Sequence, residues 1–112
     1  MTTGLGIDIV ETKRLTEVAK NKKHPFLKNF TKAELNYCFK FKDPIPHLAG
    51  TFAAKEAVSK ALGAHKNFLG EIEIRRNKNG APEVFRKNKK MGKMLISIAH
   101  DGHYAVAVAS HQ

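Results

Sequence analysis

The sequence predicts an α+β fold that combines an antiparallel β-sheet with a long central helix and shorter helices. Residues 4–10 alternate between two faces, as a strand does. Residues 47–64 form the longest helical pattern, with an apolar stripe at helical spacing. Two hairpin signals, at 79–80 and 101–102, separate alternating segments in the rest of the chain. The order of one strand, then helices, then an antiparallel meander is typical of the α+β class.

Local signals predict the other elements in chain order. An amphipathic pattern indicates a short helix over 11–20. Thr31 and Glu34 have the spacing of a capping box, so a second helix should begin there. A turn over 43–46 precedes the long helix, and Gly63 follows it as a C-terminal cap. Four more strands are expected, at 71–75, 82–86, 94–100 and 103–110.

Composition bounds the class of protein. The 112 residues and the apolar fraction of 42% fit one globular domain over residues 1–112. Lys and Arg number 20 against 10 Asp and Glu, which gives a formal net charge of +10. Such an excess favours an anionic partner: nucleic acid, a membrane surface, a phosphorylated ligand or an acidic protein.

The single cysteine, Cys38, excludes an internal disulfide and a cysteine-rich zinc site. It falls on the apolar side of a predicted helix and should pack there. The first residues lack the basic region of a signal peptide, and no stretch approaches the ~20 apolar residues of a membrane span. We therefore expect a cytoplasmic protein without a membrane partner.

Two acidic positions suggest chemistry. Asp8 lies on the Gly6/Val10 face of the first strand, where a buried carboxylate needs a partner or a metal ion. An edge position, at which Asp8 meets solvent or a backbone N–H, is the alternative. Glu56 and Lys60 share one helical face, either as a surface ion pair or with Glu56 joining Asp8 around a hard divalent cation such as Mg²⁺.

Two further interpretations stay open from the residues alone. His100 ends a strand beside a turn, where a structural histidine and a site histidine are both reasonable. A small basic nucleic-acid-binding module is the alternative function, and tight, salt-sensitive RNA binding would favour it. The lysines are scattered from Lys13 to Lys93, and no helix-turn-helix spacing or zinc finger accompanies them, so we expect no nucleic-acid partner.

Three segments in this order resemble the holo-acyl-carrier-protein synthases, the small bacterial 4′-phosphopantetheinyl transferases. They are Gly-Ile-Asp-Ile-Val-Glu at 6–11, Phe-Ala-Ala-Lys-Glu-Ala-Val-Ser-Lys-Ala at 52–61, and Ser-Ile-Ala-His at 97–100. The resemblance covers essentially the whole chain, and the Phe-x-x-Lys-Glu-x-x-x-Lys segment is its most specific part. It implies the phosphopantetheinyl transferase fold.

The resemblance also implies an enzyme that moves 4′-phosphopantetheine from coenzyme A to a serine of apo acyl carrier protein. The reaction would depend on Mg²⁺, release adenosine 3′,5′-bisphosphate and support fatty acid biosynthesis. The family further implies a homotrimer with active sites at subunit interfaces. We expect the last strand to contribute to that interface through its two faces, Ala105/Ala107/Ala109 and Val106/Val108.

The catalytic and metal-binding roles implied by the resemblance fall on three residues. Asp8 and Glu56 would ligate Mg²⁺ together with the coenzyme A pyrophosphate. Lys60 would lie beside the phosphates and favour the leaving group, since positive charge is needed where negative charge develops. The general base stays open between Glu56 and a water on the metal.

The binding roles implied by the resemblance fall on five other residues. His100 would lie at the coenzyme A site, to which Lys60 also belongs. A neighbouring subunit would offer the hairpin of Asn79, Gly80 and Pro82 to the nucleotide. Arg14 would meet the acidic carrier protein.

The sequence departs from the family pattern at two positions. Thr51 stands where relatives commonly carry Arg, so a phosphate contact is missing or comes from another residue, such as Lys55. Ala99 replaces the usual hydroxyl residue before His100 and removes a hydrogen bond near the nucleotide. Both departures affect the expected affinity more than the expected activity.

Overall fold

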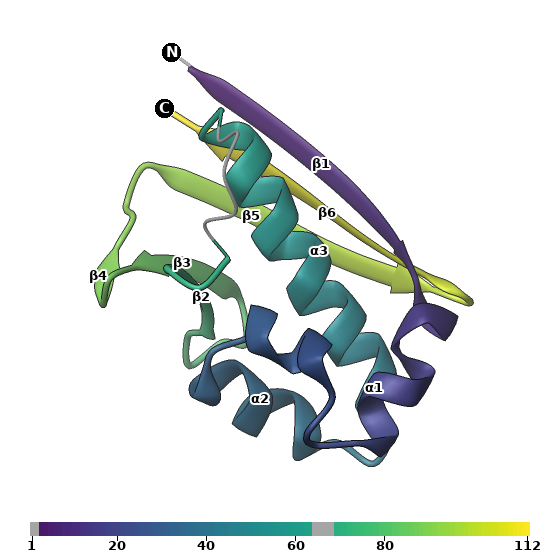
Figure 1. The fold of residues 1–112 in the computed structure, drawn as a ribbon. Coiled ribbons are helices and arrows are strands. Elements are labelled where there is room, and N and C mark those ends of the chain that lie inside the picture. Colours follow the sequence, from purple (N-terminus) through teal and green to yellow (C-terminus); the bar gives the residue numbers. More distant parts are fainter. Residues whose placement is uncertain (1–2, 64–68) are drawn as a thin grey trace.

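Helix α3 (Ile45–Ala61) crosses the middle of the molecule, and a three-stranded sheet packs along it (Figure 1). The computed structural model describes residues 3–63 and 69–112. The sheet has the order β1-β6-β5 and is antiparallel throughout. Its strands are β1 (Gly4–Glu11), β5 (Met94–Asp101) and β6 (Tyr104–His111). The first and last strands of the chain are therefore neighbours.

A second three-stranded sheet, β2-β3-β4, projects beside β5. It contains β2 (Ile72–Arg76), β3 (Pro82–Arg86) and the two-residue β4 (Lys89–Lys90). The α+β class, with its antiparallel sheet and long central helix, is confirmed. The single meander expected after the helices is wrong, because the C-terminal strands divide between two sheets and β6 pairs with β1 as well as β5.

Short helices fill the chain between β1 and α3. A 3₁₀ turn and a one-turn helix occupy the place of the helix predicted over 11–20, and α2 begins at the predicted capping box. In order they are a 3₁₀ helix (Thr12–Leu15), α1 (Thr16–Lys20), a second 3₁₀ helix (Pro25–Asn29) and α2 (Lys32–Phe39).

The cap after the C-terminal end of α3 agrees with the prediction, and the position of its first residue does not. Gly63 has φ +67° just beyond the helix, as expected of a C-terminal cap. The helix begins at Ile45, inside the segment read as a turn, because Pro44 and Pro46 occupy the start of a helix, where a missing N–H costs no hydrogen bond. Position 64, the predicted end, lies outside the described residues.

The β-sheet approaches α3 very closely because both carry small residues at the contact. A Cβ on Gly6 would collide with the carbonyl oxygen of Ala57. On β6, Ala105, Ala107 and Ala109 are buried under the same helix. The expectation that this alanine face lies at a subunit interface is therefore wrong, since α3 already covers it.

A buried ion pair ties α2, α3 and β2 together. The ammonium of Lys55 lies 2.7 Å from Oε1 of Glu34, and both side chains are fully buried. The backbone N–H groups of Thr31 and Ile74 donate to the same carboxylate at 2.8 and 2.7 Å. Because breaking a buried pair leaves an uncompensated charge, these bonds fix β2 firmly against the helices.

In the part of the chain that the structure describes, no helix is long and apolar enough to cross a membrane.

Candidate active site

Strand β1 and helix α3 bring together Asp8, Glu56 and Lys60. Asp8 points toward α3 from the Gly6/Val10 face, with 18% of its side chain exposed. The Lys60 ammonium lies 3.2 Å from Oδ1 of Asp8 and donates to the carbonyl oxygen of Ile7 at 2.8 Å. The ion pair of Lys60 thus joins α3 to β1 through Asp8, whereas the sequence pattern had suggested a pair with Glu56 on the helix surface.

The charge of Asp8 acts on the carboxylate of Glu56. Burial raises the pKa of Glu56, and the nearby Asp8 carboxylate raises it further, while Lys60 and Arg14 lower it. Arg14, an exposed residue of the first 3₁₀ helix, therefore acts on Glu56 through its charge. We call Asp8, Glu56 and Lys60, with the charge of Arg14 acting on them, the carboxylate site.

The carboxylate site fits Mg²⁺ better than an all-protein metal cage. Among the described residues, no group of three or more His, Cys, Asp or Glu could hold an ion. Mg²⁺ is commonly held by one or two carboxylates together with substrate phosphates and water. Asp8 and Glu56 supply two half-buried carboxylates beside open solvent, so the donor set matches that kind of shared site.

His100 belongs to a different cluster, built around His47 near the start of α3. The His47 ring stacks on Phe41, with centroids 3.6 Å apart, and meets His100 edge-on at 6.2 Å. Burial lowers the pKa of His47, and electrostatic interaction with His100 and Arg76 lowers it further. This end of α3 is an aromatic surface, with Lys40 against the Phe41 ring.

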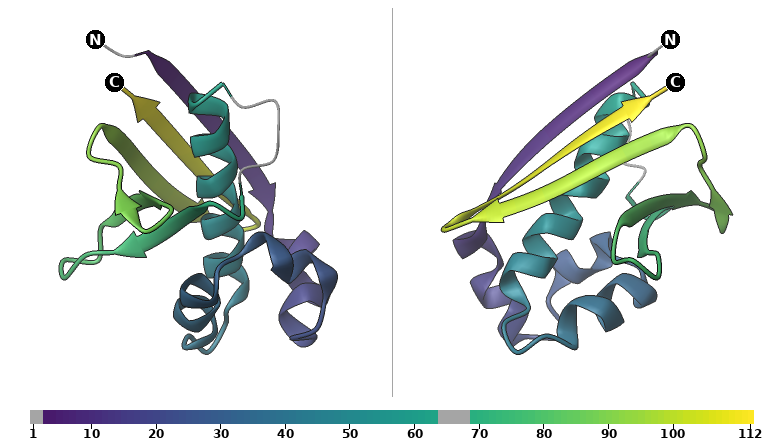
Figure 2. Two further views of the ribbon diagram at one scale, coloured as in Figure 1. Left: turned by 60° about the vertical axis from the view of Figure 1, so that its left-hand side comes forward. Right: turned by 180° about the vertical axis from the view of Figure 1, so that it is seen from behind.

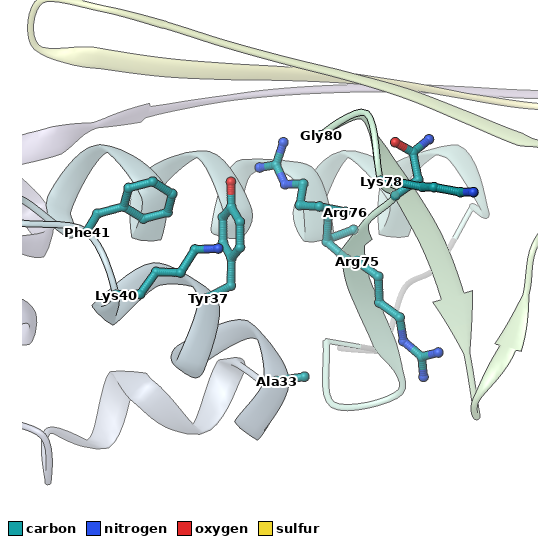
Figure 3. Close-up of a pocket in the computed structure, with 10 residues that line it drawn as sticks. Ala33, Tyr37, Lys40, Phe41, Arg75, Arg76, Lys78 and Gly80 are labelled. Atoms are coloured by element: carbon teal, nitrogen blue, oxygen red, sulfur yellow. The ribbon is translucent and has the colours of Figure 1, made fainter.

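The hairpin predicted at 79–80 lies beside that cluster. Gly80 has φ +84°, and the Asn77 side chain accepts hydrogen bonds from the N–H groups of Asn79 and Ala81 at 2.9 and 3.1 Å. Pro82 then begins β3. Between the hairpin and α2 lies a cavity of about 520 Å³ (Figure 3).

One copy of the chain holds these two groups apart. The helical rise puts Glu56 about 13 Å beyond His47 along the axis of α3. Strand β1 is one edge of its sheet, and the hairpin lies beside the opposite edge strand, β5 (Figure 2). Asp8, Glu56, Lys60 and Arg14 are brought together, whereas His100, Asn79, Gly80 and Pro82 form a second region.

Lys55 and Thr51, the two positions considered for a phosphate contact, are both buried. The expectation that Lys55 replaces an arginine at position 51 as a phosphate contact is wrong, because Lys55 is fully buried and bonded to Glu34. Thr51 is also buried, and its hydroxyl lies 3.6 Å from Cys38 Sγ. Neither side chain reaches a ligand at the surface.

Arg76 is the site residue that sequence reasoning missed. It extends from β2 toward Tyr37, whose ring centroid lies 5.0 Å from its guanidinium carbon. A signal was available: Arg76 shares its strand face with the buried residues Ile72 and Ile74. An arginine in phase with buried positions is a candidate for a function.

Comparison with known proteins now defines the class. A family model described as the 4′-phosphopantetheinyl transferase superfamily matches residues 4–109. The chain belongs to this family. Its curated relatives are holo-[acyl-carrier-protein] synthases: that of Thermodesulfovibrio yellowstonii is 44% identical over 96% of each chain, and that of Protochlamydia amoebophila is 44% identical over 97% of each.

Solved structures agree with the family assignment. The holo-(acyl-carrier-protein) synthase of Bacillus anthracis in complex with CoA (3′,5′-ADP) superposes with a TM-score of 0.80 at 32% identity, covering 99% of this chain and 96% of that one. The Helicobacter pylori enzyme in complex with coenzyme A gives 0.79 at 33% identity, covering 96% and 99%. The fold and the enzyme class expected from the sequence are both confirmed.

Proposed function

We propose that this protein is a Mg²⁺-dependent enzyme that transfers 4′-phosphopantetheine from coenzyme A to a serine of apo acyl carrier protein. Adenosine 3′,5′-bisphosphate is the second product, and fatty acid biosynthesis is the process served. The domain spans residues 1–112 and acts in the cytoplasm. The observation that carries the proposal is the meeting of Asp8, Glu56 and Lys60 across β1 and α3.

The transfer is a substitution at phosphorus. The serine oxygen of the carrier protein forms a bond to the phosphorus that carries pantetheine, and the bond from that phosphorus to the bridging oxygen of the diphosphate breaks. Negative charge builds up on the adenosine side. Such reactions depend on positioning and charge stabilisation, and they need no nucleophile from the enzyme.

Each residue of the carboxylate site has a role in this scheme. Lys60 exchanges its bonds to Ile7 and Asp8 for the leaving phosphate, which its half-exposed ammonium can reach. The serine proton would go to Glu56 or to a water on the metal, the two candidates for the general base. In the metal-free protein, burial and the neighbouring Asp8 raise the pKa of Glu56.

Asp8 and Glu56 are the residues that would hold magnesium. When bound with the diphosphate, it would neutralise charge that develops during transfer. Asp8 also keeps Lys60 oriented while substrate is absent, through the 3.2 Å contact.

We further propose that the enzyme is a homotrimer whose sites form between copies. The outer face of the large sheet supports this, because it exposes apolar side chains along all three strands; they are Leu5, Ile7, Ile9, Leu95, Tyr104 and Val108. A neighbouring copy would present His100 and the hairpin of Asn79, Gly80 and Pro82 to coenzyme A held at the carboxylate site. Such an arrangement would explain why the carboxylate site and the region of His100 and the hairpin are separate within one copy.

Arg14 is the proposed contact for the acidic carrier protein. It is exposed, and its charge acts on Glu56 at the carboxylate site, where the carrier serine must arrive. The surrounding lysines and the net charge of +10 would steer an acidic partner and speed encounter, an effect that weakens as salt rises.

The test uses the whole protein, coenzyme A and an apo acyl carrier protein, with the intact mass of the carrier as readout. Added Mg²⁺ should produce a gain of one phosphopantetheine group, and a chelator should stop it. A carrier of unchanged mass at every Mg²⁺ concentration would reject the proposed activity, and an undiminished gain in chelator would reject the metal.

A further inference from the structure

The carboxylate of Glu34 is a junction between three elements. The side chain is fully buried in the first turn of α2. Its Oε1 accepts from the ammonium of Lys55 in α3 at 2.7 Å and from the N–H of Thr31 at 2.8 Å. Its Oε2 accepts from the N–H of Ile74 in β2 at 2.7 Å. One carboxylate thus joins α2, α3 and β2.

The bond to Ile74 lies at an edge of the second sheet. That sheet has the order β2-β3-β4, so β2 has a strand on one side only, where Ile74 faces Val84. Backbone N–H groups at such an edge need other partners, and Glu34 supplies one. Apolar packing is not directional, whereas a hydrogen bond is, so this bond fixes the position of β2 along the helices.

Strand β2 continues directly into the hairpin of Asn79, Gly80 and Pro82. Asn77, three residues beyond Ile74, donates its N–H to the carbonyl oxygen of Ala81 at 2.9 Å. Its side chain accepts from the N–H groups of Asn79 and Ala81. These bonds make the hairpin a rigid extension of β2. A displacement of β2 at Ile74 would therefore be carried to the hairpin.

The pair is turned away from the carboxylate site of its own copy. Lys55 and Glu56 are consecutive residues of α3, so their side chains leave the helix about 100° apart. Lys55 is fully buried and reaches Glu34, whereas Glu56 is half-buried and acted on by the charge of Asp8. One residue of this dipeptide holds α2 and β2, and the next belongs to the reaction site.

Stability alone does not account for a charged pair at this place. Taking both charges out of water is costly, and apolar side chains of similar volume are often at least as stabilising. The best-documented use of a buried polar group is to fix how elements are placed against one another. The elements fixed here are the helix that carries Glu56 and the strand that continues into the hairpin.

We propose that Glu34 and Lys55 are positioning residues for coenzyme A: by fixing β2 to α3, they place the hairpin of their own copy at the carboxylate site of a neighbouring copy. The inference rests on the proposed function and on the proposed trimer. Neither side chain touches the substrate. The pair should therefore act on the affinity of the adjoining site for coenzyme A and leave the chemical step to Asp8, Glu56 and Lys60.

The double variant Glu34→Leu/Lys55→Met tests the effect on affinity. It removes both charges together, so no uncompensated charge stays in the core, and it deletes the acceptor of the Ile74 N–H. We expect KM for coenzyme A to rise ~10- to 100-fold while kcat stays within about twofold of wild type. Urea unfolding and light scattering on the same samples check that the variant is folded and trimeric. A wild-type KM in the folded variant overturns the inference.

If the double variant fails to fold, Glu34→Asp replaces it. This variant keeps both charges and withdraws the carboxylate by one methylene, so it cannot reach Lys55 and Ile74 at their present spacing. KM for coenzyme A should again rise with little change in kcat. An unchanged KM in Glu34→Asp overturns the inference as well.

The matched control is Thr51→Val. Thr51 is another buried polar residue of α3, and its hydroxyl meets Cys38 Sγ of α2 at 3.6 Å. The substitution alters a polar contact between α2 and α3 and leaves the bond from Ile74 to Glu34 in place. It should keep the wild-type KM. A rise equal to that of the double variant would assign the effect to any change in this core and overturn the specific role of the pair.

Mixed trimers show on which copy the pair acts. The double variant is produced together with Asp8→Ala, and two affinity tags isolate trimers that contain both. A copy of Asp8→Ala offers a correctly placed hairpin to the intact carboxylate site of the double variant. At a coenzyme A concentration near the wild-type KM, the mixed trimer should transfer faster than the two separate samples combined. A rate equal to their sum would place the effect within one copy and overturn the inference.

The outcome is separable from that of the proposed function. Transfer by a wild type, with the double variant at the same KM, would overturn only the role of the pair. If no transfer occurs at all, calorimetric titration with coenzyme A still decides. Tighter binding by wild type than by the double variant would then reject the activity and leave the role of the pair standing, and equal binding would reject both.

Discussion

The Lys60 ammonium bridges the carbonyl oxygen of Ile7 and the carboxylate of Asp8. About half of its side chain is exposed, so those bonds can be exchanged for bonds to a phosphate. A cation placed where charge develops contributes more to the transition state than to substrate binding. Its removal should therefore act on turnover.

For Lys60→Ala we expect kcat to fall ~100-fold or more while KM for coenzyme A changes little. Steady-state rates of carrier modification at varied coenzyme A measure both constants. Lys32→Ala, at an exposed position in the first turn of α2, is the control and should keep wild-type rates. An unchanged kcat in Lys60→Ala would reduce Lys60 to an ion-pair partner of Asp8.

Cys38 gives a second prediction at this scale. Burial raises the pKa of its thiol to about 11, against an ordinary value of 9.0, although the Thr51 hydroxyl lowers it in part. Two pKa units reduce the thiolate fraction ~100-fold, and burial blocks access as well. Native protein should react with a thiol reagent at pH 7 at least that much more slowly than urea-unfolded protein. Equal rates would place Cys38 at the surface.

The sequence predicted some of the side-chain roles and not others. Asp8 stood out because a carboxylate is unusual on an apolar strand face, whereas the pattern around Glu56 also fitted a surface ion pair with Lys60. The family resemblance was needed to pair the two carboxylates. Lys55 was misread, since a lysine is usually solvated and only the three-dimensional approach of Glu34 makes its burial possible. Arg76 was overlooked because its value depends on Tyr37, which arrives from a different helix.

At the scale of elements, the contact between β1 and α3 assembles the carboxylate site. Gly6 allows that contact, because any side chain there would meet the backbone of Ala57 and Ala61. The strand carries Asp8 and the helix carries Glu56 and Lys60. The separation of these two elements thus sets the geometry of the site.

Gly6→Ala should push β1 away from α3. We expect a loss of ~1–3 kcal/mol in the free energy of unfolding, and a fall in transfer rate beyond what the remaining folded fraction explains. Urea unfolding and transfer rates on the same samples test both parts. Gly92→Ala is the control, since a Cβ at Gly92 meets nothing within 4 Å. Equal behaviour of the two variants would contradict the close contact.

Elements were more predictable than their pairing. The Asn-Gly and Asp-Gly signals located both hairpins, and β3 has the predicted bounds, Pro82–Arg86. The pairing of β1 with β6 joins residues as far apart as Gly4 and His111, and no local pattern specifies such a partner. The division into two sheets is likewise a tertiary property.

At the scale of the molecule, the large sheet has one face on α3 and one face open. Among the described residues, the open face carries large apolar side chains with exposures of 40–68%. An extended apolar face of this kind marks an interaction surface. A second and third copy of the chain would cover it and bring the hairpin of one copy to the carboxylate site of another.

Ile7→Asp should prevent this assembly, because it places a charge on the apolar face, opposite Val108 of the central strand. Light scattering at micromolar concentration should report a trimer for the wild type and a monomer for the variant. Asn36→Asp, at an exposed position on α2, should remain trimeric. A monomeric wild type would contradict the shared site.

The central claim is that Asp8 and Glu56 belong to the active site of a phosphopantetheinyl transferase. The most direct measurement is the intact mass of apo acyl carrier protein after incubation with coenzyme A, Mg²⁺ and wild type, Asp8→Ala or Glu56→Ala. We predict one added phosphopantetheine with the wild type and none with either variant, although both variants melt cooperatively. Full modification by either variant at saturating Mg²⁺ would contradict the assigned site, and an unmodified carrier with the wild type would contradict the activity itself.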